Sequence, residues 1–385
     1  MSGILIFSSQ YGEGHFQAGE ALTETLRMNS ASIEAKHLDF GSFFFIKDYV
    51  LRKAYSTMIK KTPKLWRVIF EKTSSITAED CRKIAKGMEK KKVLDQIWRY
   101  EPEVIVSTHF IPAAIMGELK LKGLINVPLV TVVTDYLVHG LWIHSGTDKY
   151  IVGDKNVGKR LMDAGVATEK IMPTGIPIRP SFSQSVSKTA ARQKLALKAD
   201  GKTILVMGLN GKPVSSVEEI RDILYTLSAE ISAQFLVVCG SNKELYSELK
   251  KNIVEDKLGV KLFGHVENVQ ELMAASDLLI TKGGALTISE AIAMGLPMLM
   301  YKPIPGHEKG NALFIEAGGA GKMVETTDEL IASVVEWVNH PEQLVQMSLA
   351  ARRVLPANPT ENAVNFILQQ RKTQKAKGIH AEAIS

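Results

Sequence analysis

The chain has 385 residues, of which 45% are hydrophobic and 23% are charged, and its formal net charge at pH 7 is +6. This composition excludes a disordered or fibrous protein, and the length predicts two globular domains rather than one core. No run approaches the roughly 18 apolar residues of a membrane-spanning helix, and the first residues lack the basic stretch of a secretory signal. We therefore expect a cytoplasmic protein with an anionic partner, whose kind the charge alone does not identify.

Short apolar runs alternate with longer helical patterns along the whole chain, which is typical of doubly wound α/β domains with parallel sheets. The expected strands are 4–8, 104–107, 130–134, 149–152, 203–207, 235–238, 277–280 and 298–301. Three prolines and Gly175 in 173–180 exclude a regular helix there and suit an interdomain connector. The predicted domains are 1–180 and 181–355. A helix within 356–385, near 361–370, can cross back to the first domain, and a basic tail expected to be disordered follows it.

The two cysteines, Cys81 and Cys239, have no Cys or His nearby at metal-ligand spacing, so no zinc or redox site is expected. Cys239 ends an apolar run and is interpreted as a core residue. His139 and His144 are five residues apart and would not share a helix face, so a metal site is not expected there either.

The first expected strand leads into Gly12-Glu13-Gly14-His15, predicted to form a glycine-containing loop before a helix. Glycines let a ligand approach the backbone, and the helix start offers N–H donors. A dinucleotide fingerprint is not indicated, because its third glycine is missing and no acidic residue is expected to end a second strand. His15 would lie at the carboxyl edge of the sheet and could accept a proton from an attacking hydroxyl; alternatively, it only caps the helix or bonds a loop carbonyl.

The strand 130–134 delivers Thr134 and Asp135 to the same edge of the first sheet. Asp135 could orient His15, bind an acceptor hydroxyl or itself act as the base. The structural alternative is that Asp135 caps the following turn, which is common for an aspartate after a strand.

The segment 277–311 combines a buried strand, a small-residue loop at Gly283 and Gly284, and a helix start. Backbone amides and the helix dipole make such a place suitable for a diphosphate. Glu290, about one turn into the helix, could accept two hydrogen bonds from a ribose, while Glu308 and Asn311 could hold sugar hydroxyls. Taken singly, each of these residues could instead serve a tight turn or the helix dipole.

Together these motifs resemble the glycosyltransferase family that includes monogalactosyldiacylglycerol synthases and processive diacylglycerol glucosyltransferases, and more distantly MurG. The resemblance extends over nearly the full length and rests on Gly12-Glu13-Gly14-His15, Thr134-Asp135-Tyr136 with His139 and Trp142-Ile143-His144, Gly175-Ile176-Pro177-Ile178-Arg179-Pro180, and the segment 277–311. It implies a GT-B fold, in which two Rossmann-like domains face a central cleft, with the acceptor in the first domain and a UDP-sugar in the second. It also implies inversion at the anomeric carbon without an obligatory metal or other cofactor.

The resemblance assigns roles to particular residues. His15 is similar to the family's proposed base. Asp135, at the same sheet edge, is the second expected catalytic residue, and which of the two is the base stays open. The implied contacts to the donor are Gly208, Phe263, Gly264, His265, Gly283, Gly284, Thr287, Glu290, Glu308, Lys309 and Asn311. The implied contacts to the acceptor include Gly14, His139 and Trp142. Two departures stand out: Thr281-Lys282-Gly283-Gly284-Ala285 replaces the family's frequent Thr-Lys-Pro-Gly-Gly, and Gly310 follows Lys309.

The run 41–72 mixes aromatic residues with eight bases and only two acids, a local net charge of +6. Such a run suits a helix lying on anionic lipid, although the aromatic residues could equally pack on the sheet while the lysines face water. The residues expected at the membrane are Phe43, Phe44, Phe45, Lys60, Lys61, Lys64, Trp66 and Arg67.

The sequence thus predicts an inverting transferase that moves a hexose from UDP-glucose or UDP-galactose to a membrane lipid, most simply 1,2-diacylglycerol. It would work peripherally at the inner face of the cell membrane and bind no nucleic acid, since no nucleic-acid motif accompanies the basic run. One alternative acceptor is a polyprenol-linked sugar or a small hydrophobic alcohol. A different class of function is a non-catalytic UDP-sugar sensor.

Overall fold

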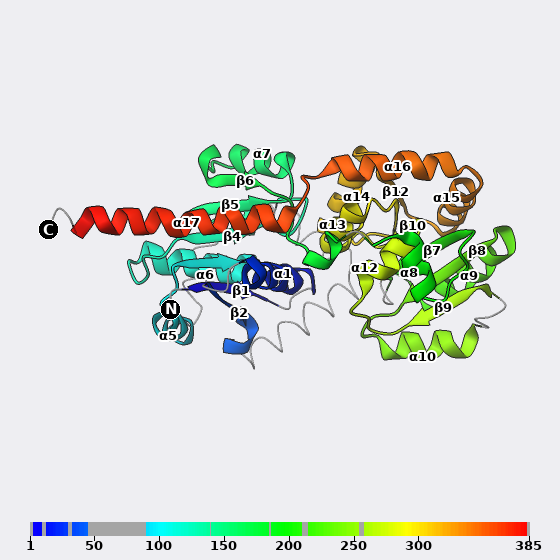
Figure 1. Cartoon of the computed structure of the whole chain (residues 1–385), viewed down its shortest axis with the longest axis horizontal. Coiled ribbons are helices and arrows are strands. Elements are labelled where there is room, and N and C mark those ends of the chain that lie inside the picture. Colours follow the sequence, from blue (N-terminus) through cyan, green and yellow to red (C-terminus); the bar gives the residue numbers. More distant parts are fainter. Residues whose placement is uncertain are drawn as a thin grey trace. The chain divides into compact units, whose positions relative to one another are not determined.

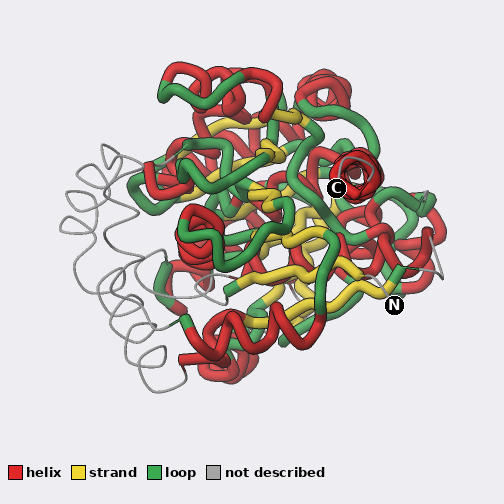
Figure 2. The backbone as a smooth tube through the Cα atoms, turned by 90° about the vertical axis from the view of Figure 1, so that its left-hand side faces the viewer, coloured by secondary structure: helices red, strands yellow, loops and turns green. Residues whose placement is uncertain are grey.

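The structure, a computed structural model, describes residues 3–9, 13–29, 33–44, 90–138, 140–184, 186–209, 215–253 and 258–382. The described residues form two compact units. The first contains those up to Pro180 together with those from Pro356 onward, and the second is Ser181–Leu355. Each unit is built on its own six-stranded parallel sheet, which confirms the predicted α/β class (Figure 1). Helices lie around the strands (Figure 2).

The first unit has the strand order β2-β1-β3-β4-β5-β6. Its strands are β1 (Gly3–Ser8), β2 (Glu34–Asp39), β3 (Val104–Ser107), β4 (Leu129–Val132), β5 (Lys149–Val152) and β6 (Ile171–Pro173). Its helices are α1 (Glu13–Asn29), α5 (Lys91–Tyr100), α6 (Phe110–Leu121), α7 (Lys155–Asp163) and α17 (Pro359–Glu382). Short 3₁₀ turns lie at Phe40–Phe44, Gly140–Trp142 and Thr168–Lys170.

Both faces of the first sheet are buried, which explains why β1 reads as an unbroken apolar run. Alternate side chains of this strand enter different cores, because successive residues of a strand point to opposite faces. Ile4 and Ile6 pack with α1 and α17, whereas Leu5 and Phe7 pack with α5 and α6. The sequence expectation that no acidic residue ends a second strand was wrong, because β2 ends at Asp39, beside Ser8 of β1.

The last helix, α17, is longer than the sequence suggested. A disordered tail was expected after residue 370, but the helix continues to Glu382 because Gln, Arg, Lys and Ala are good helix formers. The first half of the helix packs into the core of the first unit, where Val364 and Ile367 are fully buried in the cluster that contains Ile4. Burying two such side chains contributes about 1.5–3 kcal/mol each. Thr360 adds a buried hydrogen bond from the Ile178 amide to its hydroxyl, 2.9 Å long.

The second unit has the strand order β12-β11-β10-β7-β8-β9, the doubly wound arrangement in which the chain reverses direction across the sheet after the third strand. Its strands are β7 (Lys202–Met207), β8 (Ala233–Val238), β9 (Val260–Phe263), β10 (Leu278–Thr281), β11 (Met298–Tyr301) and β12 (Gly321–Val324). Its helices are α8 (Lys188–Lys194), α9 (Val217–Glu230), α10 (Lys243–Asn252), α12 (Val269–Ala275), α13 (Ala285–Met294), α14 (His307–Ala317), α15 (Thr327–Asn339) and α16 (Pro341–Val354). A 3₁₀ turn at Pro180–Phe182 precedes them.

Cys239, directly after β8, is fully buried in the core of the second unit. Burial raises the pKa of its thiol to about 11, because a thiolate would lose its hydration. The side chain is therefore a neutral core residue at physiological pH, in agreement with its interpretation from the sequence.

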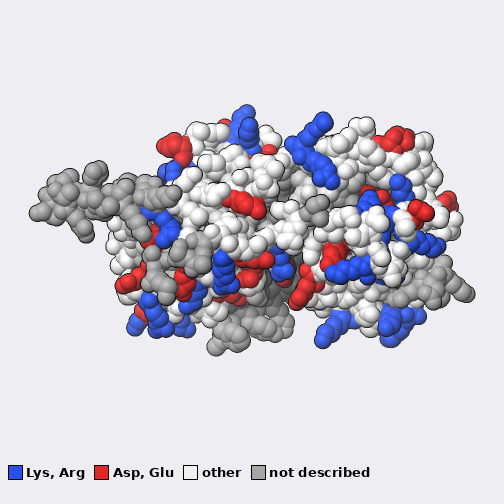
Figure 3. Space-filling model, viewed as in Figure 1, with Lys and Arg blue, Asp and Glu red and all other residues white. Residues whose placement is uncertain are grey.

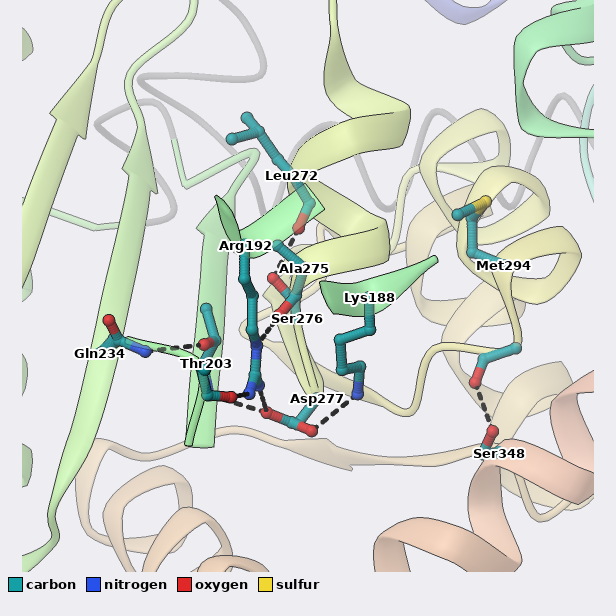
Figure 4. A network of polar contacts seen from close by, with 12 residues as sticks. Lys188, Arg192, Thr203, Gln234, Leu272, Ala275, Ser276, Asp277, Met294 and Ser348 are labelled. Atoms are coloured by element: carbon teal, nitrogen blue, oxygen red, sulfur yellow. Dashed lines mark hydrogen bonds and ion pairs between the residues drawn. The ribbon is translucent and has the colours of Figure 1, made fainter. Parts of the chain in front are cut away.

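A half-buried carboxylate connects three elements of the second unit (Figure 4). Asp277, which precedes β10, lies 2.7 Å from Nη2 of Arg192 and 2.8 Å from Nζ of Lys188, both on α8. The same carboxylate accepts a 2.8 Å hydrogen bond from the amide of Thr203 on β7. Arg192 also donates to the carbonyls of Ala275 and Ala199. This network fixes the amino-terminal ends of β7 and β10, the two strands between which the chain reverses direction across the sheet.

Candidate active site

Three loops at the carboxyl edge of the first sheet converge on His15. The strands β1, β3 and β4 are neighbours, and α1, Thr108 and Thr134 follow them in turn. Because β2 lies on the other side of β1, the connections after β1 and β3 leave in opposite directions at this point. Open parallel sheets bind ligands at such a place.

His15 is held by two threonines, one at its imidazole and one at its backbone. Its Nδ1 lies 2.6 Å from Oγ1 of Thr134, and its backbone carbonyl accepts a 2.8 Å hydrogen bond from Oγ1 of Thr108. The helix begins earlier than the sequence indicated: Gly14 and His15 belong to the first turn of α1 rather than to a loop. Backbone hydrogen bonding in the helix thus adds to the side-chain contacts that position this histidine.

Sequence reasoning missed a second histidine beside the first. The His109 ring lies edge-on to His15, with centroids 4.6 Å apart, and it stacks on Phe110 at 4.2 Å. It caps α6, since its Nδ1 accepts a 3.2 Å hydrogen bond from the amide of Ile111. Its position two residues after the end of the expected strand 104–107 was a signal for this edge of the sheet.

The other residues expected on the acceptor side differ from one another in burial and in their surroundings. Trp142 is buried, and the centroid of its ring lies 6.0 Å from that of His15; its contact with an acceptor stays a prediction. Asp135 is half-buried in the bend after Thr134. His144 is buried, and its Nδ1 accepts a hydrogen bond from the amide of Gly146. His139 lies outside the described residues.

Only the beginning of the basic, aromatic run can be compared with the structure. Phe43 was expected at a membrane, but its ring packs at 6.3 Å from Phe7 and 6.1 Å from Phe40, because the core beneath β1 offers it apolar contacts. Phe44 closes the 3₁₀ turn. The remaining residues of this prediction lie outside the described ranges: Phe45, Lys60, Lys61, Lys64, Trp66 and Arg67. Elsewhere, basic and acidic side chains alternate over the described residues of the face in Figure 3.

Loops at the carboxyl edge of the second sheet carry most of the expected donor residues. Gly208 follows β7 and Gly283 follows β10, the neighbouring strands. Both glycines have left-handed backbones, with φ of +82° and +97°. A Cβ on Gly208 would lie 3.0 Å from Oγ1 of Thr281, and one on Gly283 would lie 3.2 Å from the carbonyl of Glu308. Only glycine allows these close approaches.

The amino terminus of α13 is the feature of this edge best suited to a phosphate. Gly284 caps the helix, and a Cβ built on it would meet no atom within 4 Å, so the space beside it is open. The amides of the first helical turn have no partners within the helix. Lys282, two residues earlier, adds a cation whose Nζ lies 2.8 Å from Oε1 of Glu308.

Glu308 and Asn311 hold this loop through contacts that the sequence did not indicate. The second carboxylate oxygen of Glu308 accepts a 3.0 Å hydrogen bond from the Ile304 amide. Asn311 is fully buried and donates a 3.2 Å hydrogen bond to the carbonyl of Gly283. Contact between these two residues and a sugar stays a prediction, whereas their support of the glycine loop is observed.

The remaining donor residues lie around the same edge. Glu290 is half-buried in the second turn of α13, so it is not a first-turn acid, and Thr287 is half-buried in the first turn. Phe263 ends β9 and is half-buried, and Gly264, with open space around it, and the exposed His265 follow. Lys309 is exposed and pairs with Glu325 at 3.1 Å. Their contacts with a donor stay predictions.

The described residues contain neither a cluster of metal ligands nor a membrane-spanning helix. Within these ranges, no three or more His, Cys, Asp or Glu side chains form a group that could hold a metal ion. None of the helices in the same ranges combines the length and apolarity needed to cross a membrane.

Comparison with solved structures supports the fold. Acinetobacter baumannii MurG matches with a TM-score of 0.62 at 14% identity, covering 96% of this chain and all of MurG. The Staphylococcus aureus MnaA–UDP structure matches with a TM-score of 0.62 at 16% identity, covering 95% of this chain and 96% of the other. At these identities the matches show the fold alone, and it is the GT-B fold expected from the sequence.

Comparison of sequences identifies the family. The model of monogalactosyldiacylglycerol synthase matches residues 15–178, and that of the glycosyltransferase family 28 C-terminal domain matches residues 212–364. A processive diacylglycerol beta-glucosyltransferase of Bacillus cereus (strain B4264) is 31% identical over 377 residues, covering 95% of this chain and 93% of the relative. The enzyme of the same name from Bacillus mycoides (strain KBAB4) is 29% identical with the same coverage. The chain therefore belongs to the glycosyltransferase family of the monogalactosyldiacylglycerol synthases and processive diacylglycerol glucosyltransferases.

Proposed function

We propose that this protein transfers glucose from UDP-glucose to 1,2-diacylglycerol with inversion at the anomeric carbon. The observation that carries the proposal is the match over nearly the full length to processive diacylglycerol glucosyltransferases, which includes both sheet edges described above. UDP-glucose is preferred over UDP-galactose because these relatives are named glucosyltransferases.

In this proposal the first unit activates the acceptor and the second holds the donor. His15 takes the proton of the acceptor hydroxyl, whose oxygen attacks the anomeric carbon, and the bond from that carbon to the diphosphate breaks. The electron pair leaves with UDP. The amides at Gly284 and the start of α13, together with the ammonium of Lys282, stabilise the charge that develops on the diphosphate. Glu290 holds the ribose, and Asp135 assists at the acceptor hydroxyl.

Because these groups of the chain stabilise the charge on the leaving group, the proposed reaction needs no resident metal. The UDP-sugar is a substrate and not a cofactor. We further propose that the run 41–72 attaches the protein peripherally to the anionic inner face of the cell membrane. Its local net charge of +6 supports this, since each base contributes about 1 kcal/mol near anionic lipid.

One assay tests these points together. The full chain is incubated with UDP-glucose or UDP-galactose and with vesicles of either anionic or zwitterionic phospholipid. The vesicles contain diacylglycerol or, in a separate reaction, a polyprenol-linked sugar, and lipid products are resolved by mass spectrometry. We expect glucosyl-diacylglycerol, faster on anionic vesicles and at an unchanged rate in EDTA. Product formed only from a polyprenol-linked sugar would show that this lipid, and not diacylglycerol, is the acceptor. Saturable UDP-glucose binding without any turnover would favour a sensor.

Replacing Glu290 with alanine tests the donor half alone. We expect the Kd for UDP, measured by calorimetry, to rise about 10- to 100-fold, because hydrogen bonds to a charged group contribute about 1.5–3 kcal/mol. Glu244→Ala is the matched control, since Glu244 is an exposed helical acid on α10. An unchanged Kd in Glu290→Ala would remove Glu290 from the ribose site.

A further inference from the structure

A histidine on an outer strand of the first sheet links three elements of the first unit. Nε2 of His37, on β2, lies 2.5 Å from Oγ of Ser8, the last residue of β1. Nδ1 of the same ring is hydrogen-bonded to the carboxylate of Glu20, on α1. The side chain of His37 is 4% exposed, so its two nitrogens are satisfied by these partners rather than by water.

The order carboxylate, imidazole, hydroxyl is that of a Ser-His-Asp triad, but its hydroxyl is in no position to act as a nucleophile. Ser8 is fully buried, so a substrate does not reach its oxygen. The contacts hold in both protonation states of the ring. A carboxylate only accepts, so Nδ1 donates to Glu20, while the hydroxyl of Ser8 donates to a neutral Nε2 or accepts from a protonated one. The three residues therefore join the helix to the two strands.

One face of α1 is shaped to receive the ring of His37. Phe16, Gly19 and Glu20 are three and four residues apart, so they share this face. The centroid of the Phe16 ring lies 4.6 Å from that of His37. A Cβ on Gly19 would lie 2.5 Å from Nε2 of His37, closer than Cβ atoms approach other atoms in proteins. The helix therefore lies this close to the ring because residue 19 is glycine.

His15 directly precedes Phe16 in the first turn of α1, so a shift of this face moves it. Thr108 and Thr134 hold His15 from the side of β3 and β4. We propose that His37 is a positioning residue, which fixes α1 on β1 and β2 and thereby sets the place of His15 at the carboxyl edge of the sheet. The proposal rests on the role of His15 as the base given above.

Two substitutions on α1 disturb this contact without emptying the core. Glu20→Ala removes a carboxylate whose side chain is 42% exposed, so it leaves no buried cavity. Gly19→Ala places a methyl group against the His37 ring, although alanine favours a helix more than glycine does. Glu20→Gln is the conservative variant, because its amide oxygen still accepts from Nδ1. Glu24→Ala is the matched control, since Glu24 is an exposed acid one turn further along the helix.

We expect Glu20→Ala and Gly19→Ala each to lower kcat for glucosyl transfer about 10- to 100-fold, the usual effect of a misplacement of about 1 Å. KM for UDP-glucose should not change, because the expected donor contacts belong to the second unit. Glu20→Gln should restore kcat, and Glu24→Ala should match the wild type. All rates are measured below the temperature at which thermal melts show any variant unfolding.

The surroundings of His15 are also measured without turnover, by NMR on protein labelled with ¹⁵N-histidine. The His15 signals are assigned by their loss in His15→Gln. We expect them to shift in Glu20→Ala and Gly19→Ala and to keep their positions in Glu20→Gln and Glu24→Ala. If Gly19→Ala does not fold, the two substitutions of Glu20 decide the test alone.

Unchanged His15 signals or an unchanged kcat in Glu20→Ala would overturn the proposal. A loss of kcat that Glu20→Gln fails to restore also counts against it, since the bond to His37 would then not be the cause. Failure of the proposed function is seen separately: the wild-type protein would make no glucosyl-diacylglycerol, or His15→Gln would keep its turnover. In that case the His15 signals of the variants still show whether His37 positions the helix.

Discussion

Replacing His15 with alanine is expected to lower kcat by about 10²- to 10⁴-fold, the usual contribution of a general base. Binding of UDP should not change, because His15 belongs to the first unit and the expected UDP contacts belong to the second. Turnover with UDP-glucose and diacylglycerol measures the first effect, and calorimetry with UDP measures the second.

The control for this variant is His340→Ala, because His340 is an exposed histidine of the second unit that pairs only weakly, at 3.2 Å, with the exposed Glu342. Full turnover in His15→Ala would mean that another group accepts the proton. Asp135→Asn would then be the next variant to measure, since Asp135 follows Thr134 at the same edge.

Replacing Arg192 with methionine is expected to give the largest loss of stability. The side chain of Arg192 is 8% exposed and that of its partner Asp277 is 15% exposed, so the substitution leaves a largely buried carboxylate with one cation fewer beside it. Breaking a buried pair from one side costs about 3–5 kcal/mol, and we expect about 3 kcal/mol because Lys188 stays beside Asp277. This corresponds to a fall of roughly 6–12 °C in the melting temperature of the second unit.

Lys188→Met is the matched control, because it removes another cation from the same carboxylate. The side chain of Lys188 is 47% exposed, and exposed pairs contribute only about 0–1 kcal/mol. Calorimetric melts of both variants distinguish them. Equal losses in the two variants would show that the buried position of Arg192 does not determine the stability of this network.

The sequence predicted the central strands well and missed those at the margins. β1, β3, β4, β5, β7, β8, β10 and β11 were all expected, with ends within two residues of those observed. The four strands that were not expected are β2, β6, β9 and β12, and each lies at an outer edge of a sheet. Edge strands are only partly buried, so β2 and β12 carry lysines and lack a continuous apolar run.

The residues of the site were predictable to a similar extent. His15 and the glycines Gly208 and Gly283 follow recognisable strands, and the carboxyl ends of parallel strands share one edge. His109 was missed because a single histidine after a strand has no motif of its own. The support that Glu308 gives to Lys282 could not be inferred, because it depends on the fold of the loop between β11 and α14.

The packing of α17 has a consequence for the order in which the chain can fold during synthesis. The apolar face formed by Ile4, Ile6 and Leu22 is covered by side chains of Val364 and Ile367, more than 300 residues later. The first unit cannot complete its core until residues 363–367 have left the ribosome, whereas Ser181–Leu355 emerges before them as one uninterrupted stretch. Of the two units, the one whose synthesis begins earlier is therefore the later to complete its core, and its apolar face must be kept from aggregating in the meantime.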